Sequence, residues 1–433
     1  MKKAFKYFLC YILYIIFLSI CYNSYLIYTY GYYGFHNNMN VLSLFISVLI
    51  YLISFAYIYN QKTNSYSKFI VYILFLISYI PSVVTFSFMP TSYRYLALLT
   101  IYWFMLIVFT NIFNKITFKD GLKKFKSNIF GVYILVFVEL VIISFVLLKY
   151  TGINLKFDDV YSLRENYFAS SMPLIFTYLY AAFKVVNPLL FIYLYNRKKT
   201  FMALMSLLIQ VLAFLGDGSK STLFSIIIAF IIIKYVQRKE NTNFLENDNF
   251  KLYILYGLVI INVLGFIENA VFMSSLIYNY FIRRLFFVPS LLNQCYYDFF
   301  TSNSVDLFRQ SILGKLGFTS PYNMKIPKLI SYYYFNGADM LANNGLFSDA
   351  YMNLGVSGVF IMPLLISLAF RFLDYCTKHI KPVYLITVLV SVSYIFLSSS
   401  FFTVLLTHGY LILCLVILIV IPKDNFGGDK NWK

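Results

Sequence analysis

The chain has 433 residues, of which 61% are hydrophobic and only 12% are charged, and its formal net charge is +18 at pH 7. The apolar share of soluble globular proteins is nearer half, so this composition excludes a soluble fold and indicates a membrane-embedded protein. The positive charge does not indicate nucleic-acid binding, because most basic residues fall in short segments between apolar stretches, as in the cytoplasmic loops of membrane proteins.

Apolar segments follow one another along almost the whole chain. A helix needs roughly 20 mostly apolar residues to cross a bilayer. The sequence predicts about twelve such spans, at residues 7–29, 40–59, 69–89, 95–113, 128–150, 173–195, 201–216, 221–236, 251–273, 354–375, 383–400 and 405–421. We therefore predict an all-α integral membrane protein that forms a single polytopic domain over residues 1–433.

The basic residues predict the orientation of these spans. Every even-numbered span returns the chain to a segment rich in lysine and arginine, and short basic loops stay cytoplasmic. Both termini are therefore predicted to be cytoplasmic, and the first apolar run, which is too long for a signal peptide, is interpreted as a retained anchor. The outer side has a smaller loop at 151–172 and a large loop at 274–353, between spans nine and ten.

Cysteine and histidine do not indicate a metal or redox site. The five cysteines and three histidines are scattered along the chain, and no C-x-x-C motif occurs. The spacing of these residues therefore predicts neither a thiolate metal site nor a redox motif.

Two adjacent arginines, Arg283 and Arg284, lie in the first part of the large loop. The surrounding segment, 276–300, alternates aromatic and polar residues, which favours an interfacial helix. Arginine presents a planar fork of donors that matches phosphate oxygens. The pair is therefore a candidate for binding a pyrophosphate whose lipid tail remains in the bilayer, and the alternative is that both residues bind ordinary anionic headgroups.

Two further outer segments carry candidate ligands for the same phosphate. Lys220 lies in the turn Asp217-Gly218-Ser219-Lys220-Ser221 between spans seven and eight, where glycine permits a close approach and lysine supplies donors at a helix N-terminus. The alternative is that the serines of this turn only cap the next helix. In the smaller loop, Arg164 is a candidate phosphate ligand that Asp159 orients, or else the two form a local ion pair in a solvated loop.

A fourth segment, 343–358, leads into the tenth span. Its small and amide-bearing residues permit close packing and hydrogen bonds to sugar hydroxyls, as at Asn344 and Asn353. Asp349 is the carboxylate best placed to orient an acceptor hydroxyl or remove its proton. Equally, Asp349 is placed to cap a helix or to pair with one of the arginines.

Ionisable residues also occur within the predicted spans. A charge near the membrane centre costs roughly 2.5–3.5 kcal/mol on insertion scales, so such residues usually have partners. Lys184 and Glu139 are predicted to form a buried structural pair between spans six and five. Glu268 is predicted to reach an outer cavity, and His408 is a further acid–base candidate.

Taken together, the outer segments resemble those of the O-antigen polymerase (Wzy) family, the oligosaccharide repeat-unit polymerases of bacterial envelopes. The resemblance covers about residues 150–375. Its features are D-V-Y-x-L-R at Asp159 to Arg164, G-x-K-S at Gly218 to Ser221, the Arg283-Arg284 pair followed by Tyr297-Asp298-Phe299-Phe300, and N-x-G-x-x-x-D-A-Y-x-N-x-G-x-x-G from Asn343 to Gly358.

The resemblance implies a GT-C-like glycosyltransferase of the bacterial cytoplasmic (inner) membrane with its active site toward the periplasm or exterior. Such an enzyme polymerises undecaprenyl-pyrophosphate-linked repeat units into the O-antigen of lipopolysaccharide or into capsular polysaccharide. The implied partners are that lipid-linked oligosaccharide, membrane lipids and a chain-length regulator protein. No nucleotide sugar, metal or other cofactor is implied.

The same resemblance implies a set of site residues. The implied catalytic residues are Arg283, Arg284 and Asp349. The residues implied to bind the pyrophosphate or glycan are Lys220, Arg164, Asp159, Tyr161, Asn344, Tyr351 and Asn353.

Two other functions stay open at the level of sequence. An O-antigen ligase typically has a histidine in its large outer loop, and the loop at 274–353 contains none. A flippase or other transporter of lipid-linked units needs charged residues along a path through the bilayer, whereas most of the functional-looking charge here is predicted on one face.

Overall fold

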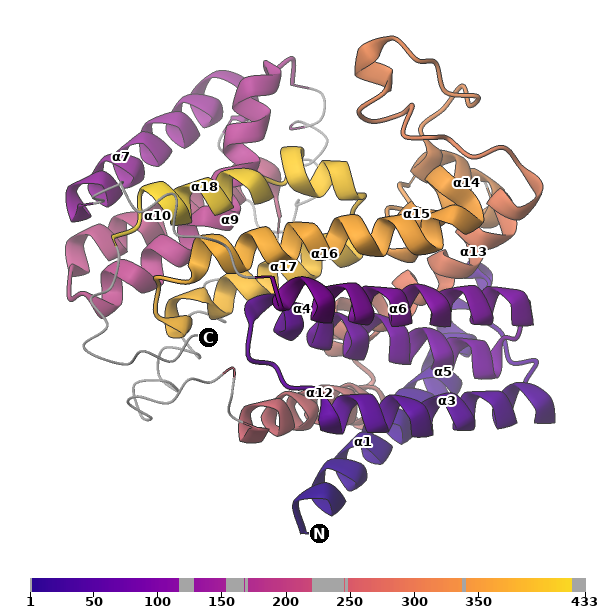
Figure 1. Ribbon diagram of the computed structural model, residues 1–433. Helices are drawn as coiled ribbons and strands as arrows, with labels where there is room; N and C mark the ends of the chain where they lie inside the picture. The colour runs from indigo at the N-terminus through magenta and orange to yellow at the C-terminus, as the bar shows by residue number, and fades with distance from the viewer. Residues whose placement is uncertain are drawn as a thin grey trace. The chain divides into compact units, whose positions relative to one another are not determined.

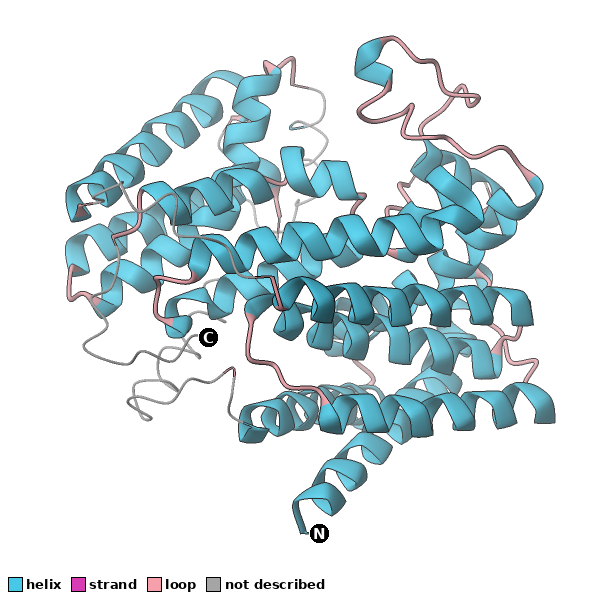
Figure 2. Cartoon of the chain, in the orientation of Figure 1, coloured by secondary structure: helices cyan, strands magenta, loops and turns pink. Residues whose placement is uncertain are grey.

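The structure (Figure 1) is a computed structural model that describes residues 2–116, 128–152, 167, 170–219, 245, 248–336 and 340–422. Within these ranges every regular element is a helix and none is a strand, as Figure 2 shows. Nine of the helices in the described ranges are long and apolar enough to cross a membrane, and two shorter apolar helices follow near the C-terminus. The prediction of an all-α fold with many apolar helices is confirmed.

The long helices coincide with nine of the predicted spans, and the two shorter helices coincide with the last two. The predicted span at 221–236 lies outside the described residues. The tenth predicted span begins earlier than expected, at Phe347 rather than near residue 354, because a 3-10 turn joins two helices into the continuous run Phe347–Thr377.

The chain divides into two compact units, and the division falls inside helices α16 and α17. The first unit comprises Met1–Ile116, Leu245–Arg371 and Ser393–Phe401, and the second comprises Thr117–Phe244, Phe372–Val392 and Phe402–Lys433. Helices that begin in the first unit are α1 (Lys2–Cys21), η1 (Tyr22–Leu26), α2 (Ile27–Tyr30), η2 (Gly31–Tyr33), α3 (Val41–Asn60), α4 (Tyr66–Leu74), η3 (Phe75–Tyr79), α5 (Ile80–Phe88), α6 (Tyr93–Asn114), α12 (Asp248–Phe272), η5 (Tyr278–Phe287), α13 (Val288–Ser302), η6 (Gly314–Leu316), α14 (Ile326–Tyr334), α15 (Phe347–Leu354), η7 (Gly355–Ser357) and α16 (Gly358–Thr377). Helices that begin in the second are α7 (Ile129–Val146), η4 (Leu147–Thr151), α9 (Leu174–Asn196), α10 (Thr200–Asp217), η8 (Pro382–Leu385), α17 (Ile386–Ser398), η9 (Thr403–Thr407) and α18 (Tyr410–Ile419).

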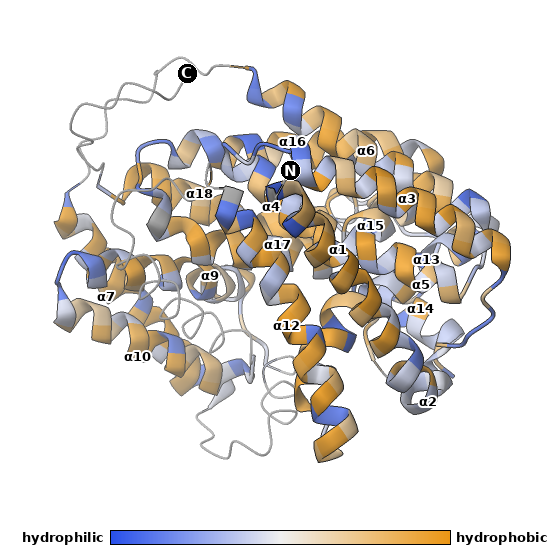
Figure 3. Ribbon diagram, turned by 90° about the horizontal axis from the view of Figure 1, so that it is seen from below, coloured by the Kyte–Doolittle hydropathy of each residue, from blue (hydrophilic) through white to orange (hydrophobic). Residues whose placement is uncertain are grey.

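Helix α3 of the first unit buries small polar residues and exposes large apolar ones, the reverse of a helix in a soluble protein. Its buried residues include Ser43, Ser47 and Ser54, whereas large apolar residues such as Phe45 and Ile53 are exposed. Figure 3, coloured by hydropathy, shows that α3 consists mostly of apolar residues. Small residues at helix contacts and large apolar residues toward the surroundings are typical of helices that pack within lipid.

The continuous helix α4–η3–α5, Tyr66–Phe88, is the most buried apolar helix of the described chain, with 94% of its most apolar stretch buried. Two of its hydroxyl groups are satisfied by carbonyls of the same helix. The Ser82 hydroxyl donates to the Ser78 carbonyl at 2.7 Å, and the Thr85 hydroxyl donates to the Pro81 carbonyl at 2.9 Å. These two hydroxyl groups therefore occupy interior positions with their donors paired.

The first part of the large loop differs from the expected interfacial helix. Helices η5 and α13 follow one another without a break, and α13 packs against η3, α5 and α15. Nearly all residues of α13 between Pro289 and Phe300 are buried. The polar residues that suggested an interface instead meet polar partners inside the unit, as where the Asn293 side-chain amide donates to the Ser82 hydroxyl at 3.3 Å.

In the second unit, α9 packs against α7, α10 and α18. Two glycines permit the closest approaches. A Cβ atom at Gly409 would lie 2.3 Å from the Ala182 Cα, and a Cβ atom at Gly216 would lie 2.5 Å from the Tyr180 hydroxyl. Glycine is therefore required at Gly409, which meets backbone atoms of α9 and has a positive φ of 72°, whereas Gly216 meets only side-chain atoms.

Candidate functional site

The arginine pair lies on the π-helical segment η5, which Glu268 at the end of α12 holds in place. The Glu268 carboxylate accepts hydrogen bonds from the backbone N–H groups of Leu276 and Ile277, both at 2.7 Å, and from the Ser274 hydroxyl at 3.0 Å. A carboxylate at this position satisfies the unpaired N–H groups of a helix N-terminus and interacts favourably with the helix dipole. Glu268 therefore acts as a cap in this structure and positions the helix that carries the arginines.

Both guanidinium groups lie over tyrosine rings. The Arg283 guanidinium carbon is 4.4 Å from the centroid of the Tyr30 ring. Tyr30 lies near the C-terminal end of the first long apolar helix, Lys3–Tyr33. The Arg284 guanidinium carbon is 5.7 Å from the centroid of Tyr280, within η5 itself. Attraction between a cation and an aromatic face contributes about 0.5–2 kcal/mol. It orients each guanidinium without neutralising its charge.

Neither arginine has a carboxylate partner among the residues that the structure describes. Arg284 is exposed and Arg283 is partly buried. The Nε atom of Arg283 is buried and has no hydrogen-bond partner. A buried donor without a partner costs about 1–3 kcal/mol, so this donor is available to an acceptor atom of a ligand.

Aromatic residues from several helices lie near this pair. The ring of Tyr25 lies 4.3 Å from that of Tyr278, and the ring of Tyr33 lies 5.8 Å from that of Phe335. The Tyr30 hydroxyl donates a hydrogen bond to the side chain of Asn279. We call these residues the tyrosine cluster: Tyr25, Tyr30, Tyr32, Tyr33, Tyr278 and Tyr280. Together with the two arginines it combines cations, hydroxyl groups and apolar ring faces.

No role was predicted for Tyr30 or for Asn279 from the sequence. The signal that points to them is the density of tyrosine between residues 22 and 33. Composition alone did not separate this run from the tyrosines elsewhere in the chain, of which there are 42 in all. Only the approach of η5 to the end of the first helix selects Tyr30.

Asp349 is buried at the start of α15, and its carboxylate accepts hydrogen bonds from other groups of the protein. One carboxylate oxygen accepts from the backbone N–H of Phe401 at 2.8 Å, and the other accepts from the side-chain amide of Asn353 at 2.9 Å. Phe401 is the first residue of a short helix, so Asp349 caps it. Of the roles considered for this residue, helix capping is the one with a contact in the structure. Asp349 makes no hydrogen bond or ion pair with Arg283 or Arg284 among the described residues.

Asn344 belongs to a buried network of polar side chains between α13 and α15. Its amide nitrogen lies within hydrogen-bond distance of three acceptors, the Asn293 side-chain oxygen and the Pro289 carbonyl, both at 3.0 Å, and the Ser348 hydroxyl at 2.8 Å. The adjacent Gly345 has no space for a side chain, because a Cβ atom would lie 2.1 Å from the Phe396 carbonyl oxygen. The expectation of close packing in this segment is confirmed.

Tyr351 and Asn353 also make contacts within the first unit. The Tyr351 hydroxyl is 3.2 Å from that of Thr301. The Asn353 side-chain oxygen accepts from the backbone N–H of Phe308 at 2.8 Å. These bonds connect α15 to α13 and to the irregular segment that follows α13. The two residues therefore stabilise the fold of the large loop, and their binding of sugar hydroxyls stays a prediction.

In the motif Tyr297-Asp298-Phe299-Phe300, the carboxylate of Asp298 accepts a hydrogen bond from the Tyr334 hydroxyl on α14 at 2.5 Å. Burial raises the pKa of Tyr334, and the neighbouring Asp298 carboxylate raises this pKa further. The tyrosine therefore stays protonated and continues to donate at ordinary pH. This bond joins α14 to α13.

The other predicted ligands, Asp159, Tyr161, Arg164 and Lys220, lie outside the described residues. The structure therefore brings together Asn344, Asp349, Tyr351 and Asn353 in the contacts around α15, and places Arg283 and Arg284 with the tyrosine cluster. Within the described part of the chain, no group of three or more histidine, cysteine, aspartate or glutamate residues is arranged to hold a metal ion.

The predicted pair between Lys184 and Glu139 is wrong. Lys184 forms an ion pair with Asp217 at the end of α10 and lies over the ring of Tyr180. Glu139 instead accepts from the side-chain amide of Asn187 at 2.9 Å. A side chain on a helix leans toward the helix N-terminus, and the C-terminal end of the antiparallel α10 lies beside that end of α9. Lys184 is therefore directed toward Asp217.

Comparison with known proteins gives no relative, because no protein-family model, curated protein or solved structure matches this chain.

Proposed function

We propose that this chain is a metal-independent glycosyltransferase that polymerises undecaprenyl-pyrophosphate-linked oligosaccharide repeat units into O-antigen or capsular polysaccharide. The proposed reaction takes place at the outer face of the bacterial cytoplasmic membrane. The observation that supports it is the pair Arg283 and Arg284, which lie over tyrosine rings without a carboxylate partner among the described residues. The resemblance of the outer segments to the O-antigen polymerase family supports the same function.

In the proposed reaction, a hydroxyl oxygen of the acceptor unit forms a bond to the anomeric carbon of the growing glycan. The bond between that carbon and the pyrophosphate oxygen breaks, and its electron pair leaves with the lipid pyrophosphate. The acceptor hydroxyl gives its proton to a base. Charge develops on the departing phosphate oxygens, where donors held in place before the reaction are most effective. Arg283 and Arg284 offer such donors, and guanidinium groups bind phosphate through paired hydrogen bonds.

The tyrosine cluster suits the carbohydrate part of the same substrate. Tyr32 is exposed over 63% of its surface and lies against Tyr33, with their ring centroids 4.3 Å apart. Aromatic faces pack against the apolar faces of sugar rings, while hydroxyl groups bond to sugar hydroxyls. The cluster is therefore proposed to bind the sugar that is linked to the pyrophosphate.

A transporter of lipid-linked units is the second candidate. Glu139 supports it, because this carboxylate is fully buried within a long apolar helix and one of its oxygens has no hydrogen-bond partner. Ionisable residues in such positions often mark the path of a substrate or ion through a membrane. The two candidates predict that an inactive variant accumulates lipid-linked units on different leaflets of the membrane.

The test uses a strain that lacks the gene and is complemented with Arg283→Ala, Arg284→Ala or wild-type protein. Arg309→Ala is the matched control, because Arg309 lies in the same large loop. The proposed polymerase predicts that both arginine variants lose long glycan chains and retain single repeat units on the outer leaflet, whereas the control keeps long chains. Lipid-linked units that accumulate on the cytoplasmic leaflet would support the transporter instead. Full-length glycan made by both variants would exclude the proposed role of the pair.

A further inference from the structure

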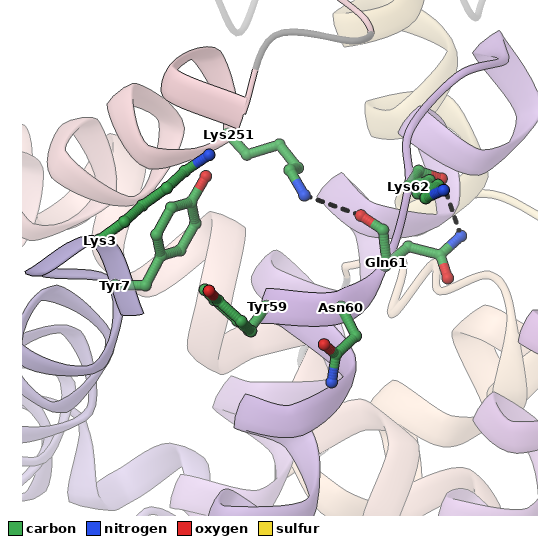
Figure 4. Close-up of a pocket in the computed structure, with 7 residues that line it drawn as sticks. All are labelled: Lys3, Tyr7, Tyr59, Asn60, Gln61, Lys62 and Lys251. Carbon is green, nitrogen blue, oxygen red and sulfur yellow. Dashed lines mark hydrogen bonds between the residues drawn. The ribbon is translucent and has the colours of Figure 1, made fainter. Parts of the chain in front are cut away.

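Buried charged side chains in the described part of the chain differ in how their charges are satisfied. Lys251, at the pocket shown in Figure 4, is 3% exposed, and its ammonium group donates to the Gln61 carbonyl oxygen at 2.8 Å. Glu139 on α7 is fully buried. Among the described residues, it is the only carboxylate with a buried oxygen, Oε1, that has no hydrogen-bond partner.

Glu139 lies near the middle of a long apolar helix. Helices α7 and η4 form the continuous run Ile129–Thr151, in which Glu139 is ten residues from the first residue and twelve from the last. At 1.5 Å per residue, the carboxylate is roughly 15 Å from either end, about half the thickness of the hydrocarbon core of a bilayer. A charge at that depth is strongly disfavoured unless a partner neutralises it.

No charged group among the described residues pairs with Glu139. Helix α7 packs against α9, α10 and η4, and the charged residues on these three elements are Lys184, Asp217 and Lys149. Lys184 and Asp217 form an ion pair with each other, whereas Lys149 is exposed and lies over aromatic rings of its own segment. The hydroxyl of Tyr180 on α9 donates to a backbone carbonyl of α10. The carboxylate therefore has no counter-charge in this packing.

Two neutral side chains hold the other oxygen of Glu139. The Asn187 amide on α9 donates to Oε2 at 2.9 Å. The orientation of this amide is fixed from α10, where the Ser206 hydroxyl donates to the Asn187 side-chain oxygen at 2.6 Å. Asn187 and Ser206 are both fully buried. One neutral hydrogen bond does not replace the hydration of an ionised carboxylate, whereas a proton on Oε1 removes the charge.

We propose that Glu139 is a proton-binding site inside the second unit, with the proton on Oε1 and Asn187 bound to Oε2. The carboxyl group stays neutral while α7, α9 and α10 are packed as in this structure, and it releases its proton when water reaches Oε1. Binding of a proton is thereby coupled to the packing of these three helices. The proposal does not depend on the proposed transferase activity, because neither Arg283 nor Arg284 takes part in it.

The first test uses dicyclohexylcarbodiimide, a hydrophobic reagent that adds to protonated carboxyl groups. The carboxyl proton passes to a carbodiimide nitrogen, the carboxylate oxygen bonds to the central carbon, and the adduct rearranges to a stable N-acylurea. Full-length wild-type protein in nanodiscs is treated at pH 7, and mass spectrometry of its peptides locates the adducts. Glu268 is the internal control, because it also lies in a long apolar helix but accepts hydrogen bonds from N–H groups with both oxygens.

We expect at least about tenfold more adduct at Glu139 than at Glu268, since hydrogen bonds to both oxygens favour the charged form of a carboxylate. The extent of modification should be the same in sodium chloride and in choline chloride. No adduct at Glu139, or equal modification of the two residues, would overturn the proposal. Protection of Glu139 by sodium would also overturn it, because a metal ion would then occupy the site of the proton.

The second test does not require the reagent to reach the site. Thermal unfolding midpoints of the wild type and Glu139→Gln are compared between about pH 6 and 9, where a glutamate of the unfolded chain is ionised. A folded protein that holds the proton binds more protons than the unfolded chain does. The wild-type midpoint should therefore fall with rising pH relative to that of Glu139→Gln, which has no proton to lose. Curves that stay parallel over this range would contradict the proposal.

Discussion

At the scale of single residues, charged side chains of this protein divide into those with a partner in the fold and those without one. Glu268 and Asp349 each accept two or more hydrogen bonds and cap helices. Arg283 and Arg284 have only aromatic rings beside their charges among the described residues. A charge without a partner is the stronger indication of ligand binding, because the fold itself gains little from it.

The arginine pair gives the first prediction. Arg284→Lys keeps the positive charge but removes the planar fork, so it should reduce glycan chain growth by at least about tenfold if the residue binds phosphate through paired hydrogen bonds. The measurement is the length distribution of glycan in a complemented deletion strain, with protein level checked by immunoblot. Arg309→Lys serves as the control. Activity of Arg284→Lys equal to that of the wild type would exclude paired phosphate recognition by this residue.

Asp349 gives the second prediction, which concerns its role as a cap. Asp349→Ala removes the acceptor for the Phe401 N–H group, so the free energy of unfolding should fall by about 1–2 kcal/mol. Asp349→Asn retains one acceptor oxygen and should be less destabilised. Thermal unfolding in detergent measures both effects. A variant Asp349→Asn that is stable yet makes no polymer would show that the carboxylate also acts in the reaction, while unchanged stability of Asp349→Ala would contradict the capping role.

At the scale of elements, the position of α15 depends on close backbone contacts. The backbone N–H of Gly345 donates to the Leu397 carbonyl at 3.0 Å. At Gly358, a Cβ atom would lie 2.1 Å from the Ala350 carbonyl oxygen. The glycines of this motif therefore allow α15 to approach the end of α17 and allow α16 to follow α15 within a tight turn. Their role is packing, as in the close helix contacts of other membrane proteins.

Gly345 gives the third prediction. Gly345→Ala places a methyl group against two backbone carbonyls, at 2.1 Å from Phe396 and 2.5 Å from Ser399, so it should destabilise the protein by about 1–3 kcal/mol. The matched control is Gly257→Ala in α12, where a Cβ atom would meet nothing within 4 Å. This control should be neutral or stabilising, because alanine has the higher helix propensity. Equal thermal midpoints for the two variants would contradict the packing role.

At the scale of the whole molecule, long apolar helices make up much of both units. In the first unit, Lys3 and the arginine pair lie at opposite ends of the apolar helix Lys3–Tyr33, because Arg283 lies over Tyr30. Because short basic loops remain cytoplasmic, we predict that Lys3 is inside and the arginines are outside. This sidedness is a prediction that labelling can test.

The fourth prediction concerns this sidedness. All five cysteines are buried, so a cysteine introduced at an exposed position dominates labelling by a membrane-impermeant maleimide. Ser302→Cys, at the end of α13, should react in intact cells, and Asn64→Cys, in the connection between α3 and α4, should react only after the membrane is opened. Lys220→Cys should behave as Ser302→Cys does. If positions 302 and 220 label from different sides, a phosphate site shared by Arg283 and Lys220 is excluded.

Several features of the fold were predictable from the sequence, because they depend on composition along the chain. Nine predicted spans coincide with long apolar helices, since the length of an apolar run is a local property. The partner of Lys184 was not predictable. Lys184 lies on α9, and both α7, which carries Glu139, and α10, which carries Asp217, pack against α9. Only the rotation and depth of these helices select Asp217 as the partner. Burial of α13 was missed because its polar residues resemble those of a surface helix until their buried partners are known.

The sequence by itself determined that this protein is helical and apolar, and that two adjacent arginines lie among aromatic residues, because these properties belong to residues that are neighbours along the chain. The tertiary structure decided which groups meet across the chain. Tyr30 lies under Arg283 although more than 250 residues separate them, and Asp349 binds the N–H group of Phe401. Helix packing sets these distances, and many packings are compatible with one hydropathy pattern. Whether a charge is available to a ligand is therefore a property of the folded chain.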